Sequence, residues 1–390
     1  MRKLFLFPAT FVCMRKLAIE EFMRESKGAL LLDVRSPSEY RHAHIPGAVS
    51  LPLFTDAERA VVGTEYKQVG RQAAIKTGLD YFGPKMRKMV EEVEELVRSK
   101  QFAVCSTETP AVGSQLPTAN SVFVYCWRGG MRSSAVSWLL NLYGFDVTLL
   151  TGGYKAFRNY VLQSFEQQYP FKILSGYTGS GKTELLQQLK ADGEKIICLE
   201  TIASHKGSAF GNINMPPQPT QEMFENLLSH ELRAISSEPV EANAGLQTPN
   251  PKHQTSSIWL EDESQRIGLV NIPNALWYTM RNAPLYFLDI PFEERLKHIT
   301  EEYSRCEKDR LRHAVERIKK RLGGLETKNA LQYLDEGNYT ECFRILLHYY
   351  DKLYRKALHN RENLSALLTN IRCDTVTVQN ASLVSQLISS

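Results

Sequence analysis

The sequence has few of the features of a secreted, membrane-bound or metal-clustered protein. It has seven cysteines, an odd number, with no Cys-x-x-Cys pair and no Cys/His cluster at zinc spacing. Unpaired cysteines indicate a reducing, cytoplasmic setting. No stretch approaches the roughly 20 apolar residues that a membrane-spanning helix needs. We therefore expect a cytoplasmic protein that does not associate with membranes and holds no tightly bound metal.

The sequence also lacks a large excess of charge of one sign. The formal net charge of the 390 residues is +4, so any affinity for a polyanion has to come from local basic patches. Hydrophobic residues make up 43% of the chain and charged residues 23%, which is ordinary globular material. Disorder of the whole chain is thereby excluded, and the length suffices for two or three separate cores.

The first residues resemble a signal peptide only in part. MRKLFLFPATFVC opens with positive charge and a short apolar run, but Pro8 interrupts the run and no small-x-small cleavage site follows. We therefore do not expect secretion. Because the MRKL at 14–17 repeats the MRKL at 1–4, translation can start at either methionine.

The first half of the chain alternates predicted strands and helices, the pattern of a parallel sheet. Buried strands are expected at 29–34, 121–125 and 146–150. An apolar-periodic helix over 135–142 lies between the last two. We predict an α/β domain over residues 1–165, which is a comfortable domain size.

The same alternation restarts in the second half and predicts another α/β domain, over residues 166–390. Strands are expected at 171–175 and 195–199, with a helix over 184–190 between them. The chain beyond Ile290 is expected to be largely helical. The fold class is therefore α/β, with two successive domains and a helical C-terminal part.

Two stretches break this alternation. Residues 106–120 are rich in Thr, Pro and Ser, and residues 236–257 are rich in Pro, Asn and Gly. Such compositions favour turns and cannot bury a core. Both are expected to be surface insertions.

One cysteine has surroundings that can activate it. Cys126 ends a predicted strand and opens the run CWRGGMRSS, which leads into a helix. Gly129 and Gly130 allow amides to point at an anion, and the helix N-terminus near Arg132 adds its dipole. These effects favour a thiolate, and equally a persulfide or perselenide anion on that sulfur. The predicted anion loop around Cys126 is Arg128, Gly129, Gly130, Arg132 and Ser133. The other cysteines are expected to be inert thiols.

Two further motifs accompany this loop. Asp-Val-Arg stands at 33–35 and His-Ile-Pro-Gly-Ala at 44–48. Together with Cys126 they resemble the rhodanese-type sulfurtransferases, which implies a rhodanese-like domain over residues 1–165. The loop departs from many single-domain rhodaneses, which look like Cys-x4-Arg-Ser, because it is Cys-x5-Arg-Ser. That spacing also occurs in cysteine phosphatases, so loop length alone leaves both reactions open.

A glycine-rich loop predicts a second site. Residues 176–183 fit G-x-x-x-x-G-K-[ST], with an apolar strand before them and a helix after them. The glycines let the backbone wrap an anion, Lys182 offers an ammonium to the terminal phosphate, and Thr183 can hold Mg²⁺. The predicted phosphate-binding residues are Gly176, Gly179, Ser180, Gly181, Lys182 and Thr183.

Acidic and polar segments farther along are candidates for completing this second site. The expected strand at 258–260 runs into an acidic turn, in which Glu261 or Asp262 can hold Mg²⁺ through water. A solvated acidic turn is the alternative. SHKGSAFG at 204–211 is polar and contains glycine. Its candidate contacts with substrate or phosphate are His205, Lys206 and Ser208.

Short motifs follow one another in a fixed order along both halves. They are GTEYKQ at 63–68, CWRGGMRS at 126–133, GGYKAFR at 152–158, GSGKT at 179–183, SHKGSAFG at 204–211, FENLL at 224–228, LEDESQRIG at 260–268, PFEERL at 291–296 and YYDKLYR at 349–355. In order and spacing they resemble the tRNA 2-selenouridine synthases over nearly the whole chain. The resemblance implies a rhodanese-like domain followed by a P-loop NTPase-like domain.

This resemblance also implies a reaction. Sulfur would be replaced by selenium at the wobble 2-thiouridine of tRNA, through an S-geranyl-2-thiouridine intermediate, with geranyl diphosphate and selenophosphate as substrates. Cys126 would carry the selenium as a selenyl sulfide. The phosphate loop would hold the diphosphate of the geranyl donor, whose oxygens present themselves to Lys182 and Mg²⁺ as those of a nucleotide do. No cofactor is expected to be tightly bound.

Two basic segments are candidates for binding tRNA phosphates. In the predicted helix over 308–321 the residues that fall near one face are Arg310, Arg317, Lys320 and Arg321. The second segment places basic residues beside tyrosines that can stack on an unpaired base, and its members are Lys352, Arg355, Lys356, Tyr349, Tyr350 and Tyr354. A solvated helix face is the alternative for both segments.

Two rival functions stay open from the residues alone. One is a Cys-x5-Arg phosphatase with the phosphate-loop domain as regulator, which would need a general acid near Cys126 that the sequence does not identify. The other is a nucleotide-switched RNA-binding module with an inactive cysteine domain. An effect of Cys126→Ser on transfer chemistry separates the expected function from the second rival.

Overall fold

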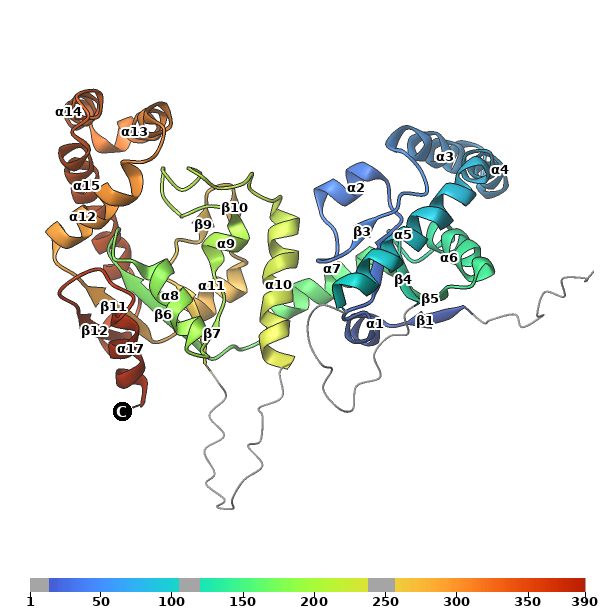
Figure 1. Cartoon of the computed structure of the whole chain (residues 1–390), viewed down its shortest axis with the longest axis horizontal. Coiled ribbons are helices and arrows are strands. Elements are labelled where there is room, and N and C mark those ends of the chain that lie inside the picture. The colour runs from blue at the N-terminus through green and yellow to red at the C-terminus, as the bar shows by residue number, and fades with distance from the viewer. Residues whose placement is uncertain (1–13, 105–119, 238–256, 390) are drawn as a thin grey trace, which may run out of the picture. The chain divides into compact units, whose positions relative to one another are not determined.

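The computed structural model describes residues 14–104, 120–237 and 257–389. Most of the two expected insertions, and the N-terminal segment 1–13, lie outside the described residues. The chain divides into two compact units, Met1–Leu162 and Gln163–Ser390 (Figure 1). Each unit contains one five-stranded parallel sheet with helices packed on it, which confirms the predicted α/β class. No helix among the described residues is long and apolar enough to cross a membrane.

The sheet of the first unit has the strand order β1-β5-β4-β2-β3, and all neighbouring pairs are parallel. The predicted strands at 121–125 and 146–150 are confirmed as β4 and β5. Because β4 lies in the middle of the sheet, Cys126 stands at the carboxyl end of the central strand, where α/β proteins place ligands. In chain order the strands are β1 (Arg15–Leu17), β2 (Leu30–Asp33), β3 (Val49–Ser50), β4 (Ser121–Tyr125) and β5 (Asp146–Leu150).

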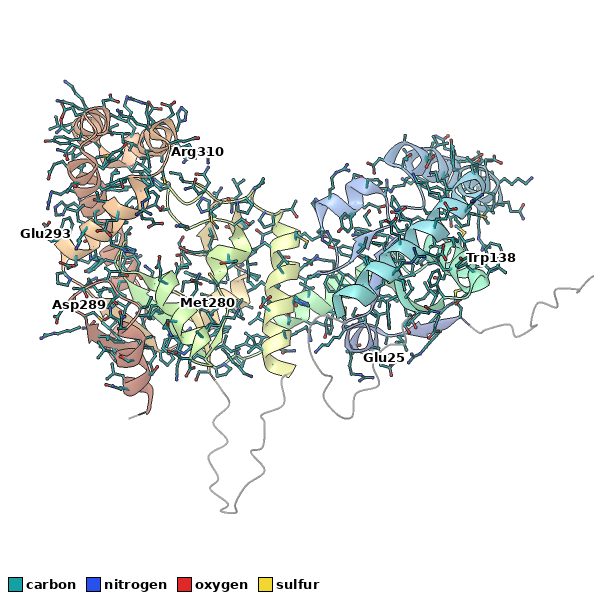
Figure 2. The ribbon with its side chains drawn as sticks, viewed as in Figure 1. Glu25, Trp138, Met280, Asp289, Glu293 and Arg310 are labelled. Atoms are coloured by element: carbon teal, nitrogen blue, oxygen red, sulfur yellow. The ribbon has the colours of Figure 1, made fainter. Side chains whose placement is uncertain are left out.

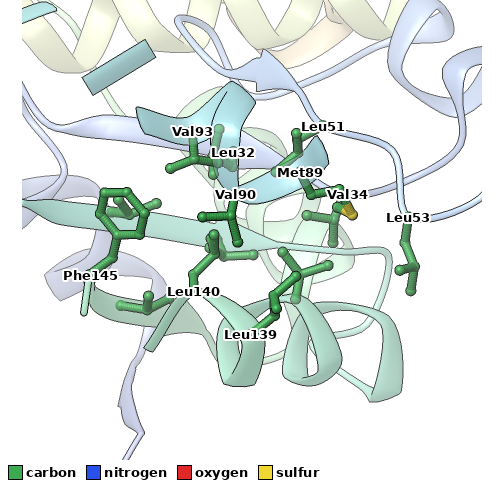
Figure 3. Close-up of a cluster of buried hydrophobic side chains, with 14 of the residues drawn as sticks. Leu32, Val34, Leu51, Leu53, Met89, Val90, Val93, Leu139, Leu140 and Phe145 are labelled. Carbon is green, nitrogen blue, oxygen red and sulfur yellow. The ribbon is translucent and has the colours of Figure 1, made fainter. Parts of the chain in front are cut away.

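Helices cover both faces of this sheet. On one face α5 and α6 pack on the strands through a buried apolar cluster that includes Leu32, Val90 and Leu140 (Figure 3). On the other face Phe22 of α1 packs edge-on against Phe123 of β4, with ring centroids 5.3 Å apart. The helices are α1 (Ile19–Glu25), α2 (Pro37–His42), α3 (Asp56–Gln68), α4 (Arg71–Phe82), the 3₁₀ turn η1 (Gly83–Lys85), α5 (Met86–Val104), α6 (Met131–Tyr143) and α7 (Gly153–Ser164).

The sheet of the second unit has the strand order β12-β11-β6-β8-β7, again parallel throughout. The predicted strand at 195–199 is wrong in its second half, because it stops at Ile196. The amide of Leu199 donates to the buried carboxylate of Glu261, which turns the chain into α9. The strands are β6 (Phe171–Gly176), β7 (Lys195–Ile196), β8 (Ile258–Glu261), β11 (Leu285–Asp289) and β12 (Leu368–Arg372), with a small antiparallel pair, β9 (Arg266–Ile267) and β10 (Val270–Asn271).

The helices of the second unit form two groups. One covers the sheet, and the other, α12 to α15, builds a separate apolar core beyond it. The expectation of a largely helical chain after Ile290 is confirmed, with β12 as the exception. Figure 2 labels the exposed residues Glu293 of α12 and Arg310 of α13. Glu293 pairs with Arg344, and Arg310 pairs with Glu307. The helices are α8 (Lys182–Ala191), α9 (Leu199–Ala203), α10 (Gln221–Ser237), α11 (Asn274–Arg281), α12 (Phe292–Tyr303), α13 (Lys308–Leu322), α14 (Gly324–Asp335), α15 (Tyr339–His359), α16 (Leu364–Leu367) and α17 (Asn380–Ser389).

Candidate functional site

The thiol of Cys126 is buried at the point where β4 gives way to a short loop and then to α6. Its Sγ lies 3.2 Å from the Oγ of Ser133, which is itself 3.1 Å from the carbonyl oxygen of Gly130. A hydroxyl has one proton, so Ser133 donates to one of these two partners at a time. The sulfur thus faces the first turn of a helix and a hydroxyl donor, an arrangement that stabilises negative charge on sulfur.

A glycine pair from another part of the chain supports the cysteine loop from behind. The amide of Tyr154 donates to the carbonyl of Cys126 at 2.8 Å, and that of Lys155 donates to Trp127 at 3.0 Å. Gly153 has a φ of +58°, and a Cβ there would overlap the carbonyl of Cys126 and the amide of Gly129. Only glycine fits such a close approach of two backbones. The GGYKAFR motif therefore shapes the cysteine loop.

The two glycines of the loop itself differ in conformation. Gly129 has a φ of +64°, as expected for a residue that turns its amide inward. Gly130 has a φ of −102° and a ψ of −147°. A positive φ is therefore found at Gly129 and not at Gly130, and the orientation of both amides toward an anion stays a prediction.

A buried ion pair lies beneath the loop. The guanidinium of Arg35 binds both carboxylate oxygens of Asp33, donates to the carbonyl of Ala43 at 2.6 Å, and lies 3.8 Å from the ring centroid of Tyr154. Burial disfavours the charged guanidinium, yet the hydrogen bond and charge of Asp33 raise the pKa of Arg35. The Asp-Val-Arg motif is thus a structural support for the loop, joining β2 to the start of α7.

The arginines of the loop are engaged in different ways. Arg132 donates to Glu39 at 2.7 Å, and Arg59 of α3 lies 3.3 Å from the same carboxylate. Burial alone would raise the pKa of Glu39, but its hydrogen bond with Arg132 lowers it. Arg128 is exposed. Arg132 is therefore anchored to α2 rather than left free to turn toward the sulfur.

A cavity of about 870 Å³ opens in front of Cys126. Besides the cysteine loop it is lined by α3 and α4, among them Gly63, Thr64 and Lys67 of the GTEYKQ motif. The sequence pattern did not connect α3 and α4 with the cysteine, because the contact joins segments about sixty residues apart. The GTEYKQ motif was the feature of the sequence that could have indicated a role for α3 in this site.

The phosphate loop at 176–183 lies between β6 and α8, as predicted. Gly179 has a φ of +81°, and a Cβ there would come within 2.6 Å of Ile299 Cγ1 and 3.0 Å of the carbonyl of Arg295. The ammonium of Lys182 donates to the carbonyl of Gly176 at 2.9 Å. The hydroxyl of Ser180 is buried and has no hydrogen-bond partner among the described residues. An orphaned donor beside the free amides of a helix N-terminus suits an anionic oxygen.

Arg295 of the PFEERL motif holds the outer side of the phosphate loop. It is buried, donates to the carbonyl of Thr178 at 3.1 Å and forms two hydrogen bonds, of 2.9 and 2.7 Å, with Asp351. Its guanidinium also lies 4.9 Å from the ring centroid of Tyr177. The PFEERL and YYDKLYR motifs thus meet at the loop, and Asp351 and Arg295 fix its conformation.

Tyr354 and Asp262 lie in a hydrogen-bonded network behind the loop. The hydroxyl of Tyr354 lies 2.7 Å from Ser175 Oγ and 2.7 Å from Asp262 Oδ2, and Arg361 donates to Asp262 at 2.7 Å. Burial raises the pKa of Tyr354 well above its usual value. Tyr354 is partly exposed and its hydroxyl is held in this network, so its stacking on a base stays a prediction. Asp262 is engaged with Ser175, Tyr354 and Arg361 and so serves this network.

Glu261 is also engaged elsewhere. It is fully buried, accepts from the amide of Leu199 at 2.8 Å and from the thiol of Cys198 at 2.7 Å. Burial raises the pKa of Glu261 to about 7. We expected Glu261 or Asp262 to hold Mg²⁺ near Thr183. In the structure both carboxylates are hydrogen-bonded to other residues.

Two carboxylates that sequence reasoning missed face the phosphate loop. Thr183 donates to Glu200 at 3.1 Å, and Glu263 interacts with both Glu200 and Lys182. Burial raises the pKa of Glu263 well above its usual value, and the charge of Glu200 adds to the effect. Hydroxyl and carboxylate oxygens are the ligands that Mg²⁺ takes together with substrate phosphates. Among the described residues no group of three or more His, Cys, Asp and Glu side chains could hold a metal ion alone.

The SHKGSAFG loop packs against this acidic pair. A Cβ on Gly207 would overlap the carboxylate of Glu263. Lys206 forms an ion pair with Glu302, and Ser208 accepts from the amide of Phe210 at 3.1 Å. The loop therefore positions Glu263, while Lys206 and Ser208 already have partners. His205 keeps a buried Nδ1 with no hydrogen-bond partner among the described residues, and burial lowers its pKa.

The two basic segments differ in how they are exposed. On α13, Arg310 pairs with Glu307, and Arg317 donates to the carbonyl of Ala209 at 2.6 Å, so the predicted basic face is partly committed to the protein itself. Lys320 and Arg321 remain exposed. The second segment borders a cavity of about 930 Å³ that Tyr177 of the phosphate loop also lines, and its basic residues there are Lys352, Arg355 and Lys356.

Comparisons with known proteins match both units. A model of the rhodanese-like domain matches residues 19–160, and a model described as the tRNA 2-selenouridine synthase AAA domain matches residues 169–377. A tRNA 2-selenouridine synthase of Bdellovibrio bacteriovorus is 33% identical over 85% of this chain and 89% of its own length. One of Serratia proteamaculans is 35% identical over 85% of this chain and 87% of its own length.

Proposed function

The chain belongs to the tRNA 2-selenouridine synthase family, and we propose that it converts 2-thiouridine at the wobble position of tRNA to 2-selenouridine in two steps. The family implies an enzyme that modifies tRNA. One observation supports the two-step scheme above all. The chain combines a buried cysteine at a helix N-terminus with a phosphate loop that faces two carboxylates. The RNA-binding switch leaves the cysteine without a role, and the phosphatase gives the phosphate loop only a regulatory one.

The first step is assigned to the phosphate loop. The diphosphate of geranyl diphosphate lies against the N-terminus of α8, with Lys182 and the free hydroxyl of Ser180 as donors. The sulfur of 2-thiouridine attacks the allylic carbon, and diphosphate leaves. These donors stabilise the negative charge that develops on the leaving group. Thr183, Glu200 and Glu263 would hold a Mg²⁺ ion that arrives with the diphosphate and neutralises its charge.

The second step is assigned to Cys126. An S-alkyl group leaves as a thiol once a nucleophile has added to the ring carbon, whereas the sulfur of the unmodified thiocarbonyl is a poor leaving group. We infer that the Cys126 thiolate adds to this ring carbon and expels geranyl thiol, and that the selenium of selenophosphate then displaces Cys126 from the carbon. Water cleaves the P–Se bond, which releases phosphate and 2-selenouridine with no change of oxidation state. The Ser133 hydroxyl and the N-terminus of α6 stabilise the Cys126 thiolate before it adds and after it leaves.

The tRNA contacts are assigned to the basic segment of α15. Lys352, Arg355 and Lys356 line a cavity that reaches Tyr177 of the phosphate loop. Phosphates bound there would bring the anticodon toward the geranyl donor, since Lys and Arg side chains supply most nucleic-acid affinity. The exposed ring of the wobble base would then meet Lys182 and its loop.

Nucleoside mass spectrometry tests the scheme. Transfer RNA that contains 2-thiouridine is incubated with geranyl diphosphate, selenophosphate and wild-type protein, Cys126→Ser or Lys182→Ala. We expect 2-selenouridine from wild type, S-geranyl-2-thiouridine from Cys126→Ser, and neither product from Lys182→Ala. Unchanged 2-thiouridine with wild type would reject the proposal. Hydrolysis of a phosphate monoester that depends on Cys126 would then support the phosphatase.

A further inference from the structure

The cavity in front of Cys126 is more apolar than a site for selenophosphate alone needs to be. Most of its wall is apolar, and none of the described residues that line it is Asp or Glu. Selenophosphate is a compact anion that needs donors and positive charge, which the cysteine loop already supplies. A cavity of about 870 Å³ lies within the range of roughly 300–1,000 Å³ that small-molecule sites occupy. Its apolar wall therefore fits a larger, apolar ligand.

The apolar wall is also unusually exposed. Leu79 of α4 is 54% exposed, Met131 of α6 is 46% exposed and Trp127 of the cysteine loop is 39% exposed. All three line this cavity. Contiguous apolar side chains left open to water around one concave site mark a binding groove rather than scattered surface residues.

Basic side chains also line the same cavity, namely Arg59, Lys67, Arg71, Arg128 and Arg132. Arg59 and Arg132 pair with Glu39, so the basic edge of the cavity is defined here as Lys67, Arg71 and Arg128. An apolar wall with such a basic edge suits an apolar group attached to a polyanion. A protein helix or a lipid would also cover apolar surface, but the cysteine in the same cavity selects a ligand whose reacting atom has to reach sulfur.

We propose that this cavity, formed by α3, α4 and the cysteine loop, binds the apolar chain on the sulfur of the alkylated wobble base, while its basic edge holds the flanking RNA phosphates. The inference rests on the proposed function, because the apolar chain is the geranyl group added in the first step. Burying that chain against α4 brings the modified ring carbon to Cys126. It also selects alkylated over unalkylated base for the second step.

The inference is tested by measuring RNA binding under conditions in which no reaction occurs. Fluorescence anisotropy measures the affinity of the full-length protein for anticodon stem–loop RNA carrying S-geranyl- or S-methyl-2-thiouridine, with selenophosphate left out. Because burial of apolar side-chain area favours binding, we expect wild type to bind the S-geranyl RNA at least about tenfold more tightly. Leu79→Asp should remove most of that preference, and Leu79→Ala should reduce it. Val69→Asp is the matched control, because Val69 is 72% exposed and does not line the cavity.

Three results would overturn the inference. One is equal affinity of wild type for the two RNAs. A second is a preference that both Leu79 variants retain, which would place the geranyl group elsewhere. A third is a loss of affinity by Leu79→Ala that is the same for both RNAs. Failure of the proposed function would give a different result: wild type would form no 2-selenouridine from S-geranyl RNA and selenophosphate.

Discussion

The guanidinium of Arg35 lies 3.8 Å from the ring centroid of Tyr154 while it binds both carboxylate oxygens of Asp33. Arg35 thereby joins β2 to the start of α7, which supports the cysteine loop. Removal of this guanidinium leaves Asp33 as an unpaired buried charge, which typically destabilises a protein by about 3–5 kcal/mol.

We expect Arg35→Ala to lower the free energy of unfolding by that amount and to slow the selenium step. Arg87→Ala is the control, because its ion pair with Glu91 is on an exposed helix face, where such pairs contribute little to stability. Urea denaturation followed by circular dichroism measures both. Equal losses for the two variants would show that the buried pair does not support the first unit.

Gly153 allows a second test of how the cysteine loop is held. Gly153→Ala and Gly28→Ala both place a side chain at positive φ, which has a cost of about 1–2 kcal/mol. Only at Gly153 does the new Cβ overlap the carbonyl of Cys126, whereas the space around Gly28 is open. We expect Gly153→Ala to lose about 1–3 kcal/mol more and to slow conversion of S-geranyl RNA. A selenium step as fast as that of Gly28→Ala would contradict this role of Gly153.

Divalent cations should matter for one step only. Glu200 and Glu263 lie beside Thr183 and Lys182 of the phosphate loop, whereas none of the described residues that line the cavity in front of Cys126 is Asp or Glu. We expect a chelator to abolish formation of S-geranyl-2-thiouridine and to leave the conversion of S-geranyl RNA unchanged. Glu200→Gln should slow the first step by about tenfold or more. Nucleoside mass spectrometry follows both steps, and geranylation that persists in the chelator would remove Mg²⁺ from the scheme.

Cys198 and Cys342 should not substitute for Cys126. Burial raises the pKa of each thiol to about 12, and a raised thiol pKa means less thiolate at a given pH. At pH 8 the thiolate fraction is roughly one in ten thousand. We expect iodoacetamide to leave both thiols unmodified in the folded protein at pH 8 and to alkylate them in urea. Peptide mass spectrometry measures the extent of alkylation at each cysteine. Rapid alkylation of Cys198 in the folded protein would show that its thiol is reactive.

Local patterns predicted the core of both units and the position of each loop. The strands at 121–125 and 146–150 could be read from short apolar runs bounded by turn residues, and the phosphate loop from its glycine spacing. These features depend on neighbours in the sequence. The same patterns predicted a strand three residues longer than β7. They contain no information on the hydrogen bond that the amide of Leu199 donates to Glu261, which ends the strand.

Residues whose role depends on tertiary packing could not be predicted in the same way. Glu200 and Glu263 lie 63 positions apart by residue number, and only the fold brings them together at Thr183. Tyr354 and Asp351 are three residues apart on α15, so they share one face of the helix. The sequence does not tell which way that face turns, and in the structure it turns toward the phosphate loop.

The central claim is that one chain performs two separable steps at two sites. The most direct test of this claim treats the same RNA with two variants in succession, each of which is inactive at one of the two sites. Transfer RNA treated with Cys126→Ser and geranyl diphosphate is purified and then given to Lys182→Ala with selenophosphate, and nucleosides are analysed by mass spectrometry. We predict that 2-selenouridine forms in this second incubation although neither variant makes it alone. Recovery of unchanged S-geranyl-2-thiouridine would contradict the account, because Lys182 would then be needed for both steps.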